Sequence, residues 1–236
     1  MKTLVLCPSR GRPQKAGELR DSFLATRAMD DTRLLFVLDQ DDITADTYER
    51  IGLDVIRVDP PQRGMTAALN MGLASVIDVG VIDAEIIGFV GDDHRFRTVG
   101  WDATFYGYHD LEGPGIFYGN DLFRANGDIP THWFVSKQIL KALGYLALPH
   151  CRHLYLDNAW RVIGDEADCL YYFPDVVIEH MHPLAGKAEW DSGYQFVNSP
   201  DMYSGDERAF IRWLRAEGPE PHRDSDVAKV RAAIKR

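Results

Sequence analysis

Cysteine is scarce in this sequence, and its three copies, Cys7, Cys151 and Cys169, form an odd number without regular spacing. This pattern disfavours a disulfide framework and makes the cytoplasm the default compartment. No apolar run approaches the roughly 20 residues that a helix needs to span a bilayer. The apolar stretch at the N-terminus stops at Pro8 and is too short for the core of a signal peptide. We therefore expect a cytoplasmic protein without membrane insertion.

Positive charge is also in short supply, because 26 Lys and Arg residues stand against 36 Asp and Glu residues and the formal net charge is −10. A general nucleic-acid binder depends on basic residues that neutralise phosphates, so nucleic acid is not an expected partner. A small phosphorylated ligand remains possible. Arg10, Arg12, Lys15 and Arg63 fall close to the ends of predicted strands, where they would form a local positive pocket.

In the first half of the chain, short apolar runs alternate with segments of helical periodicity. Strands are predicted at residues 4–6, 33–38, 54–58 and 85–90, and helices at residues 16–29, 44–51 and 66–76. Alternation of this kind predicts an α/β fold, with a mainly parallel central sheet flanked by helices on both faces.

The second half is less regular and carries more Gly and Pro. Ser136 is the expected N-cap of a helix that ends at Gly144, and Asp157 or Asn158 opens another short helix. The remaining predicted elements are strands at 170–173 and 176–178, a loop from 183 to about 204, and helices at 206–216 and 224–235.

The predicted strand at residues 85–90 runs directly into Asp92, Asp93 and His94. In an open α/β sheet, ligands bind beyond the carboxyl ends of the strands. Carboxylates suit a cation such as Mn²⁺ or Mg²⁺, and a nucleoside diphosphate would supply further ligands. Adjacent strand residues face opposite ways, so one Asp would bind the metal while the other contacts ribose or solvent. The alternative is an ordinary polar turn after a core strand.

His180 and His182 end a second predicted strand, and the two-residue period of a strand puts both on one face. A neutral imidazole there would be a good third ligand for a Mn²⁺-like ion. Taken singly, either histidine is more often a core residue.

Two further stretches carry candidate ligand-binding residues. In "CPSRGRP", residues 7–13, Ser9 and Arg10 would line a nucleotide site, although a plain loop is equally consistent with the letters. In "QRGMTAALNMGLA", residues 62–74, Gly64 would let the backbone approach a ligand and Asn70 interrupts the apolar inner side of a helix. The alternative for this stretch is a packing helix with a solvated Asn70.

Asp157 precedes an aromatic helix in "HLYLDNAW", where it is either a helix cap or a base that faces the cleft. The stretch "PLAGKAEWDSGYQF" resembles a lid in which Lys187 supplies one cation for a leaving diphosphate, or else a plain surface loop. The His and Cys residues of "PHCRH", residues 149–153, match none of the usual zinc spacings.

Taken in order, these motifs resemble the inverting glycosyltransferases of the GT-A fold, especially the large family 2 group. The resemblance covers about residues 2–182 and includes "LLFVLDQDD", "IIGFVGDDHRF", "GWD", "YLDNAW" and "VVIEHMH". It departs at Gly91, where the family usually has its first acidic residue, and at Leu156, where the base motif usually has a second one. Asp92-x-His94 is therefore an alternative frame for the metal ligands.

The resemblance implies a role for each candidate residue. Asp157 would be the catalytic base, Asp93 would bind the metal, and His180 or His182 would complete the metal's ligands. The residues expected around the donor nucleotide are Pro8, Ser9, Arg10, Arg12, Asp39, Asp41, Arg63, Gly64, Asn70, Asp92 and Lys187.

The implied activity is transfer of a sugar, with inversion, from a nucleoside-diphosphate sugar to a hydroxyl of a protein or soluble glycan, with Mn²⁺ or Mg²⁺ as cofactor. Lys187 or Arg63 would stabilise the leaving diphosphate. The catalytic domain would span residues 1–204, divided into a nucleotide-binding half (1–95) and an acceptor half with the lid loop (96–204), and residues 205–236 would form a helical extension. A nucleotidyltransferase of the same fold and a non-catalytic nucleotide- or glycan-binding module are the alternatives.

Overall fold

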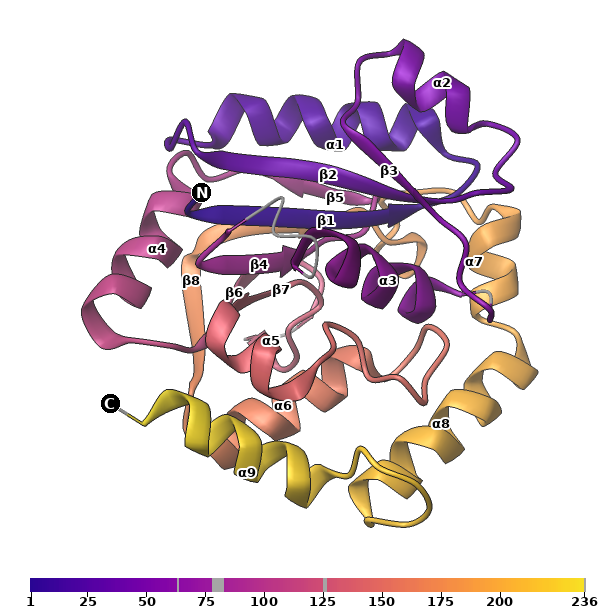
Figure 1. Ribbon diagram of the computed structural model, residues 1–236. Coiled ribbons are helices and arrows are strands. Elements are labelled where there is room, and N and C mark those ends of the chain that lie inside the picture. The colour runs from indigo at the N-terminus through magenta and orange to yellow at the C-terminus, as the bar shows by residue number, and fades with distance from the viewer. Residues whose placement is uncertain (63, 78–82, 125–126, 236) are drawn as a thin grey trace.

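Within the residues that the computed structural model describes (1–62, 64–77, 83–124 and 127–235), eight strands form one sheet in the order β3-β2-β1-β4-β7-β6-β8-β5 (Figure 1). The strands are β1 (Thr3–Ser9), β2 (Thr32–Asp39), β3 (Val55–Val58), β4 (Ile86–Phe89), β5 (His94–Phe96), β6 (Ile116–Asn120), β7 (Trp133–Ser136) and β8 (Leu170–His180). β1 to β4 are parallel, and β6 is parallel to β8. β7 runs antiparallel to β4 and β6, and β5 runs antiparallel to β8. The α/β prediction is thus confirmed.

Helices cover both faces of the sheet, as Figure 1 shows. The helices are α1 (Pro13–Thr26), α2 (Ala45–Arg50), α3 (Met65–Ile77), α4 (Trp101–Glu112), α5 (Lys137–Leu143), α6 (Leu156–Ala167), α7 (Ser192–Val197), α8 (Pro200–Leu214) and α9 (Arg223–Ile234). Leu4 and Leu6 of β1 pack into the layer of α3, α5 and α6, whereas Val5 and Cys7 pack into the layer of α1, α2 and α4. The two-residue period of a strand therefore divides the core into two layers.

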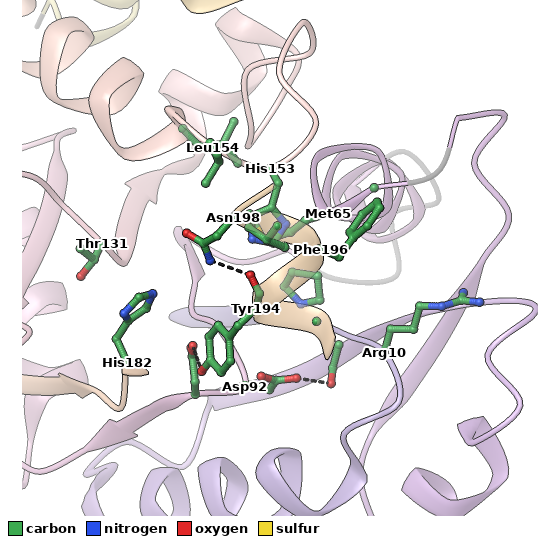
Figure 2. A pocket seen from close by; sticks show the side chains of 18 of the residues that line it. Arg10, Met65, Asp92, Thr131, His153, Leu154, His182, Tyr194, Phe196 and Asn198 are labelled. Atoms are coloured by element: carbon green, nitrogen blue, oxygen red, sulfur yellow. Dashed lines mark hydrogen bonds between the residues drawn. The ribbon is translucent and has the colours of Figure 1, made fainter. Parts of the chain in front are cut away.

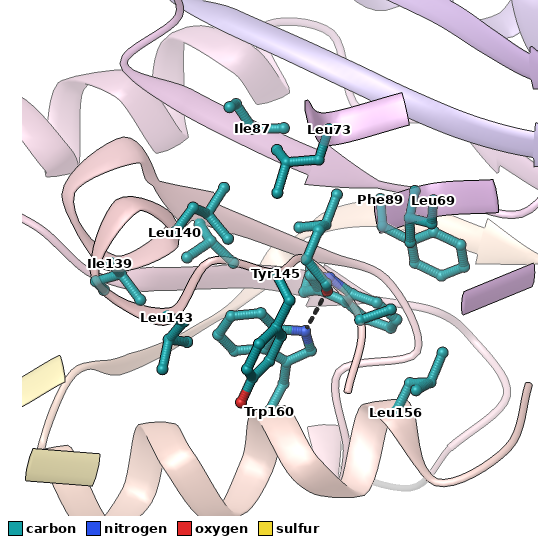
Figure 3. Packing of buried hydrophobic residues seen from close by; sticks show 14 of the residues in the cluster. Leu69, Leu73, Ile87, Phe89, Ile139, Leu140, Leu143, Tyr145, Leu156 and Trp160 are labelled. Atoms are coloured by element: carbon teal, nitrogen blue, oxygen red, sulfur yellow. Dashed lines mark hydrogen bonds between the residues drawn. The ribbon is translucent and has the colours of Figure 1, made fainter. Parts of the chain in front are cut away.

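The core of the first layer lies between the sheet and α3, α5 and α6 (Figure 3). Trp160 of α6 packs among these side chains and donates its indole N–H to the Leu146 carbonyl at 3.0 Å. In the second layer, Gly88 of β4 stands opposite Phe134 of β7. A Cβ at residue 88 would lie 2.3 Å from the Phe134 ring, so only glycine leaves room for that ring.

The C-terminal helices share the core with the rest of the chain. Trp213 of α8 and Val227 and Val230 of α9 are buried in the same cluster as α5 and α6. α8 runs from Pro200 to Leu214, so it crosses the domain boundary expected at residue 204, and that division of the chain stays a prediction. No described helix is long and apolar enough to cross a membrane.

Several elements differ from those predicted. The strands expected at 170–173 and 176–178 form the single strand β8, whose pairing with β6 shifts register after Gly119. The loop expected from 183 to 204 contains a 3-10 turn at Pro183–Ala185, α7 and the start of α8. The patterns of β5, β6, β7 and α4 were too short or too irregular to predict. Ser136 does precede α5, but its hydroxyl bonds to the Gly115 backbone instead of capping the helix.

Candidate functional site

A cavity of about 890 Å³ opens beyond the carboxyl ends of the parallel strands β1, β2 and β4. The end of β1 and the residues directly after it form one wall, which includes Pro8, Ser9 and Arg12. Residues 91–94, which come after β4 in the chain, form the floor. Residues 152–157 form the opposite wall, and α7 borders the cavity on a third side (Figure 2). This is the position at which open α/β sheets bind their ligands.

Asp92 is buried at the end of β4 and is held by the wall that follows β1. Its carboxylate accepts a hydrogen bond from the Ser9 hydroxyl at 2.7 Å and pairs with the Arg12 guanidinium at 3.3 Å. Burial and the like charge of Asp93 raise the pKa of the Asp92 carboxyl to about 6. The sequence places Ser9 and Asp92 far apart, but the parallel pairing of β1 with β4 brings them together.

Asp93 lies among two imidazoles and one phenol. His94 Nδ1 lies 3.3 Å from its Oδ1, His180 Nε2 lies 3.3 Å from its Oδ2, and the Tyr194 hydroxyl donates to Oδ2 at 2.7 Å. Burial acts to raise the pKa of Asp93, but the two histidines more than offset it and hold this pKa well below its usual range. The group is therefore an ionised carboxylate in a largely buried setting.

Asp93, His94 and His180 form a group that fits a divalent metal, because one ligand atom from each lies within 4.8 Å of the others. His94 Nε2 and His180 Nδ1 are buried and have no hydrogen-bond partner among the described residues. His94 Nδ1 accepts the Gly91 N–H at 3.1 Å, which helps to fix the orientation of this ring. A carboxylate with two imidazoles suits Mn²⁺ and similar transition metals better than Mg²⁺.

His182, the other predicted ligand, lies beside this group and not within it. Its ring centroid is 5.0 Å from that of His180, and the ring stacks on Phe123 at 5.1 Å. Its Nδ1 accepts the Leu184 N–H, which caps the 3-10 turn after β8. Burial and the neighbouring His180 lower the pKa of His182 to about 4, so the ring that borders the cavity is neutral. A ligand role for His182 stays a prediction.

The residues predicted to bind the nucleotide are only partly brought together. Pro8, Ser9, Arg10, Arg12, Asp39, Gly64 and Asp92 line the cavity. At the rim of the cavity, the half-exposed Arg10 side chain pairs with Asp39 at 2.9 Å and with Asp41 at 2.6 Å. Arg63 lies outside the described residues.

Asn70 and Lys187 have other contacts. The Asn70 carbonyl oxygen accepts the N–H groups of Leu146 and Ala147, and its amide donates to the Ala147 carbonyl. Lys187 pairs with Glu179 at 2.9 Å and donates to the Leu122 carbonyl. Neither belongs to the cavity lining that the described residues form.

Helix α7 places a carboxylate and a phenol over the cations of the cavity. Asp191 caps the helix by accepting the Tyr194 N–H at 2.9 Å, and it pairs with Arg12 at 2.5 Å and with Lys15 at 3.0 Å. The Tyr194 ring lies against both cations, each 4.5 Å from its centroid. In Figure 2 this ring points down from α7 toward the carboxylates that follow β4. Burial and the Asp93 charge raise the pKa of Tyr194 well above its ordinary value, so the phenol stays a proton donor.

Asp157 faces the cavity from the first turn of α6. Its Oδ1 accepts the Asn158 N–H at 2.9 Å, and burial raises the pKa of its carboxyl. His153 lies on the same wall, where burial lowers its pKa to about 4 and keeps the imidazole neutral. The resemblance suggested Asp157, but it gave no signal for His153.

Four other residues of the site were predicted from the sequence only in part or not at all. His94 entered it only through an alternative frame, and Lys15 only as part of a positive pocket. Asp191 and Tyr194 lie in a stretch read as a lid or surface loop, and no pattern in the letters places them against Asp93 and Arg12. Their contacts depend on how the chain after β8 folds back over β1.

No protein-family model matches the chain, and no curated protein matches its sequence. Solved structures do match. TarS of S. aureus superposes with a TM-score of 0.59 at 14% identity, over 98% of this chain and 43% of that one. This chain therefore spans less than half the length of TarS.

Two other matches contain ligands. The mannosyltransferase PcManGT of Pyrobaculum calidifontis, in complex with GDP-Man and Mn²⁺, has a TM-score of 0.61 at 14% identity, over 98% of this chain and 73% of that one. The glucosyl-3-phosphoglycerate synthase of Mycobacterium tuberculosis, with Mn²⁺, UDP-Glc and glycerol 3-phosphate, has a TM-score of 0.59 at 12% identity, over 88% of this chain and 79% of that one. Structural similarity at such low sequence identity shows a shared fold and nothing more. The chain therefore has the GT-A-like fold of these glycosyltransferases.

Proposed function

We propose that this protein is a metal-dependent glycosyltransferase that moves a sugar from a nucleoside-diphosphate sugar to an acceptor hydroxyl. The observation that carries the proposal is the group of Asp93, His94 and His180 at the floor of a cavity beyond the sheet. The structural neighbours with GDP-Man or UDP-Glc and Mn²⁺ share the fold, which supports the same class of donor here. Mn²⁺ is the favoured cofactor because two of the three donors are imidazoles, with Mg²⁺ as the alternative.

The donor would lie along the wall that follows β1. Ser9, Arg10 and Asp39 would face the nucleoside, and Asp93 with the two histidines would hold the cation. The bound cation would neutralise charge on the leaving diphosphate. Arg12 lines the cavity, and Lys15 lies behind it and pairs with the same Asp191, so both would bind phosphate oxygens once Asp191 moves away.

The acceptor, a protein or soluble glycan, would enter from the wall formed by residues 152–157. Asp157 would take the proton of the acceptor hydroxyl while that oxygen forms a bond to the anomeric carbon. The bond from this carbon to the diphosphate breaks on the opposite side, and its electron pair leaves with the nucleoside diphosphate. Displacement in one step inverts the anomeric centre. The raised pKa of Asp157 makes it a stronger base than an exposed carboxylate.

Calorimetric titration with UDP and GDP, with and without Mn²⁺, tests the donor site, and release of nucleoside diphosphate from UDP-GlcNAc or GDP-mannose tests the chemistry. We expect Mn²⁺-dependent binding and slow release to water, accelerated by an acceptor. Binding without release would instead support a non-catalytic module. Transfer of a nucleotidyl group, with release of pyrophosphate from a nucleoside triphosphate, would support the nucleotidyltransferase alternative. Absence of nucleotide binding would remove both the glycosyltransferase and the nucleotidyltransferase.

A further inference from the structure

A buried carboxylate on α8 holds the backbone of the cavity wall opposite the nucleotide side. Asp206 is 1% exposed and does not line the cavity itself. Its Oδ1 accepts the Arg152 N–H at 2.9 Å, and its Oδ2 accepts the N–H groups of His153 and Leu154, each at 2.8 Å. Three consecutive backbone donors therefore converge on one side chain.

These three N–H groups have no other acceptor among the described residues. The three hydrogen bonds are partly buried, and a backbone N–H that is shielded from water and left unpaired is costly. Without the Asp206 carboxylate, the segment would have to move toward water or rearrange. Its present path thus depends on Asp206.

The segment held in this way is the wall that carries the candidate base. All six residues 152–157 line the cavity, and Asp157 follows Leu154 by less than one helical turn. Tyr155 has a left-handed backbone conformation with φ of 65°, and its ring stacks on Phe210 of α8 at 5.5 Å. On the other side, the Arg152 carbonyl accepts the Thr66 N–H from α3. The wall is fixed to both α8 and the nucleotide side.

From this geometry we propose that Asp206 is a positioning residue for the transfer reaction, which fixes residues 152–157 so that Asp157 faces the acceptor. The inference rests on the proposed function. It also makes α8 a part of the active site, although its sequence suggested only a peripheral helix. Small displacements of a catalytic group are costly, since about 1 Å can lower a rate on the order of 100-fold.

A matched control exists on α9. Asp226 is 0% exposed, and it accepts hydrogen bonds from the Tyr145 hydroxyl at 2.6 Å and the Trp213 indole at 2.9 Å. None of these residues lines the cavity. Asp226→Asn therefore perturbs an equally buried carboxylate of the same helical layer without touching the wall.

The test compares the full-length chain with its Asp206→Ala, Asp206→Asn and Asp226→Asn variants. In hydrogen exchange, we expect the amides of residues 152–154 to exchange at least about tenfold faster in Asp206→Ala, because they lose their acceptor. In Asp206→Asn the effect should be smaller, since one carbonyl oxygen still accepts. Asp226→Asn should leave these amides unchanged. If Asp206→Ala does not fold, Asp206→Asn carries the test.

The functional readout is the release of nucleoside diphosphate from UDP-GlcNAc and GDP-mannose, with Mn²⁺ present and water as acceptor. For Asp206→Ala we expect a rate lower by about tenfold or more, with UDP affinity within about twofold of wild type and a binding stoichiometry near one. The acid limb of the rate profile should move to lower pH, because water reaches Asp157 and weakens the burial that raises its pKa, while the charge of Arg124 stays in place. Loss of stability alone would move neither the affinity nor this limb.

Unchanged exchange at residues 152–154, or an unchanged release rate despite faster exchange, would overturn the proposal. If UDP affinity and release rate fell together, Asp206 would be a general structural residue. A wild-type protein that binds neither UDP nor GDP would overturn the proposed function, and with it any role for Asp206 in transfer. The exchange result would still report whether Asp206 holds the wall.

Discussion

His94 of β5 and His180 of β8 are register partners in an antiparallel strand pair, and their rings stack with 4.4 Å between centroids. Asp93 precedes β5, and its carbonyl accepts the Met181 N–H at 2.8 Å just beyond β8. Backbone pairing therefore sets the positions of the carboxylate and both imidazoles before any metal binds. Because strands hold side chains more precisely than loops do, this group is a preorganised site.

Replacement of Asp93 by Asn should abolish the strongest ligand of the metal group. We expect Mn²⁺ affinity to fall at least about tenfold, because changes even to partners of metal ligands cost about 10- to 100-fold. Calorimetric titration with Mn²⁺ in the presence of UDP measures this. His180→Ala should behave similarly, whereas His182→Ala should have a smaller effect. An equal loss in His182→Ala would make His182 a ligand.

Tyr194→Phe should strengthen the binding of metal and nucleotide. The variant keeps the ring over Arg12 and Lys15 but loses the hydroxyl that donates to Asp93. A hydrogen bond to a charged group contributes about 1.5–3 kcal/mol, so a gain on the order of tenfold in Mn²⁺ affinity is expected. Tyr203→Phe is the control, since that hydroxyl contacts only Asn198 among the described residues. Weaker binding in Tyr194→Phe would mean that the phenol supports the metal group instead of competing with it.

Asp157→Asn should lower the rate of nucleoside diphosphate release by about 100- to 10,000-fold, the usual contribution of a general base. UDP affinity should stay within about twofold, because Asp157 lies on the wall opposite the nucleotide residues. Steady-state rates and calorimetry on the same preparation separate the two. A variant with full activity would remove Asp157 from the mechanism.

His153 should make the fold sensitive to acid. Its folded-state pKa is about 4, below the ordinary value of 6.5, so the unfolded chain binds the proton more readily. Stability from this group is present above about pH 6.5 and is lost as the pH falls toward 4. When the pH is lowered from 6.5 to 5, the wild type should lose free energy of unfolding. His153→Gln should lose roughly 1–2 kcal/mol less than the wild type does.

Urea denaturation at several pH values measures this difference. His150→Gln is the control, because His150 is exposed. Parallel pH curves for wild type and His153→Gln would show that the imidazole is not desolvated in the folded state.

The surroundings of Asp93 could be predicted from the sequence only in part. The apolar run of β4 and the carboxylates after it are adjacent in the chain, so their position at the sheet edge followed from local pattern. Strand alternation also suggested that His180 and His182 would act together. In the structure His180 stacks on His94, while β8 ends at His180 and His182 caps the 3-10 turn beside this group. A two-residue period holds only as far as the strand continues.

Local sequence patterns were enough to predict the alternation of buried strands and helices, and hence that Ser9, Asp92 and Asp93 lie at the carboxyl ends of strands. Those features depend on side-chain periodicity within single elements. The contact of Ser9 with Asp92, the stacking of His94 on His180, the position of Tyr194 and Asp191 over the cations, and the hydrogen bonds of Asp206 to the opposite wall instead arise from packing between distant elements. Asp93 and His180 are 87 residues apart, and Asp206 is 52 to 54 residues from its three N–H donors. Contacts over such distances depend on strand register and helix packing across the whole core, which no local pattern encodes.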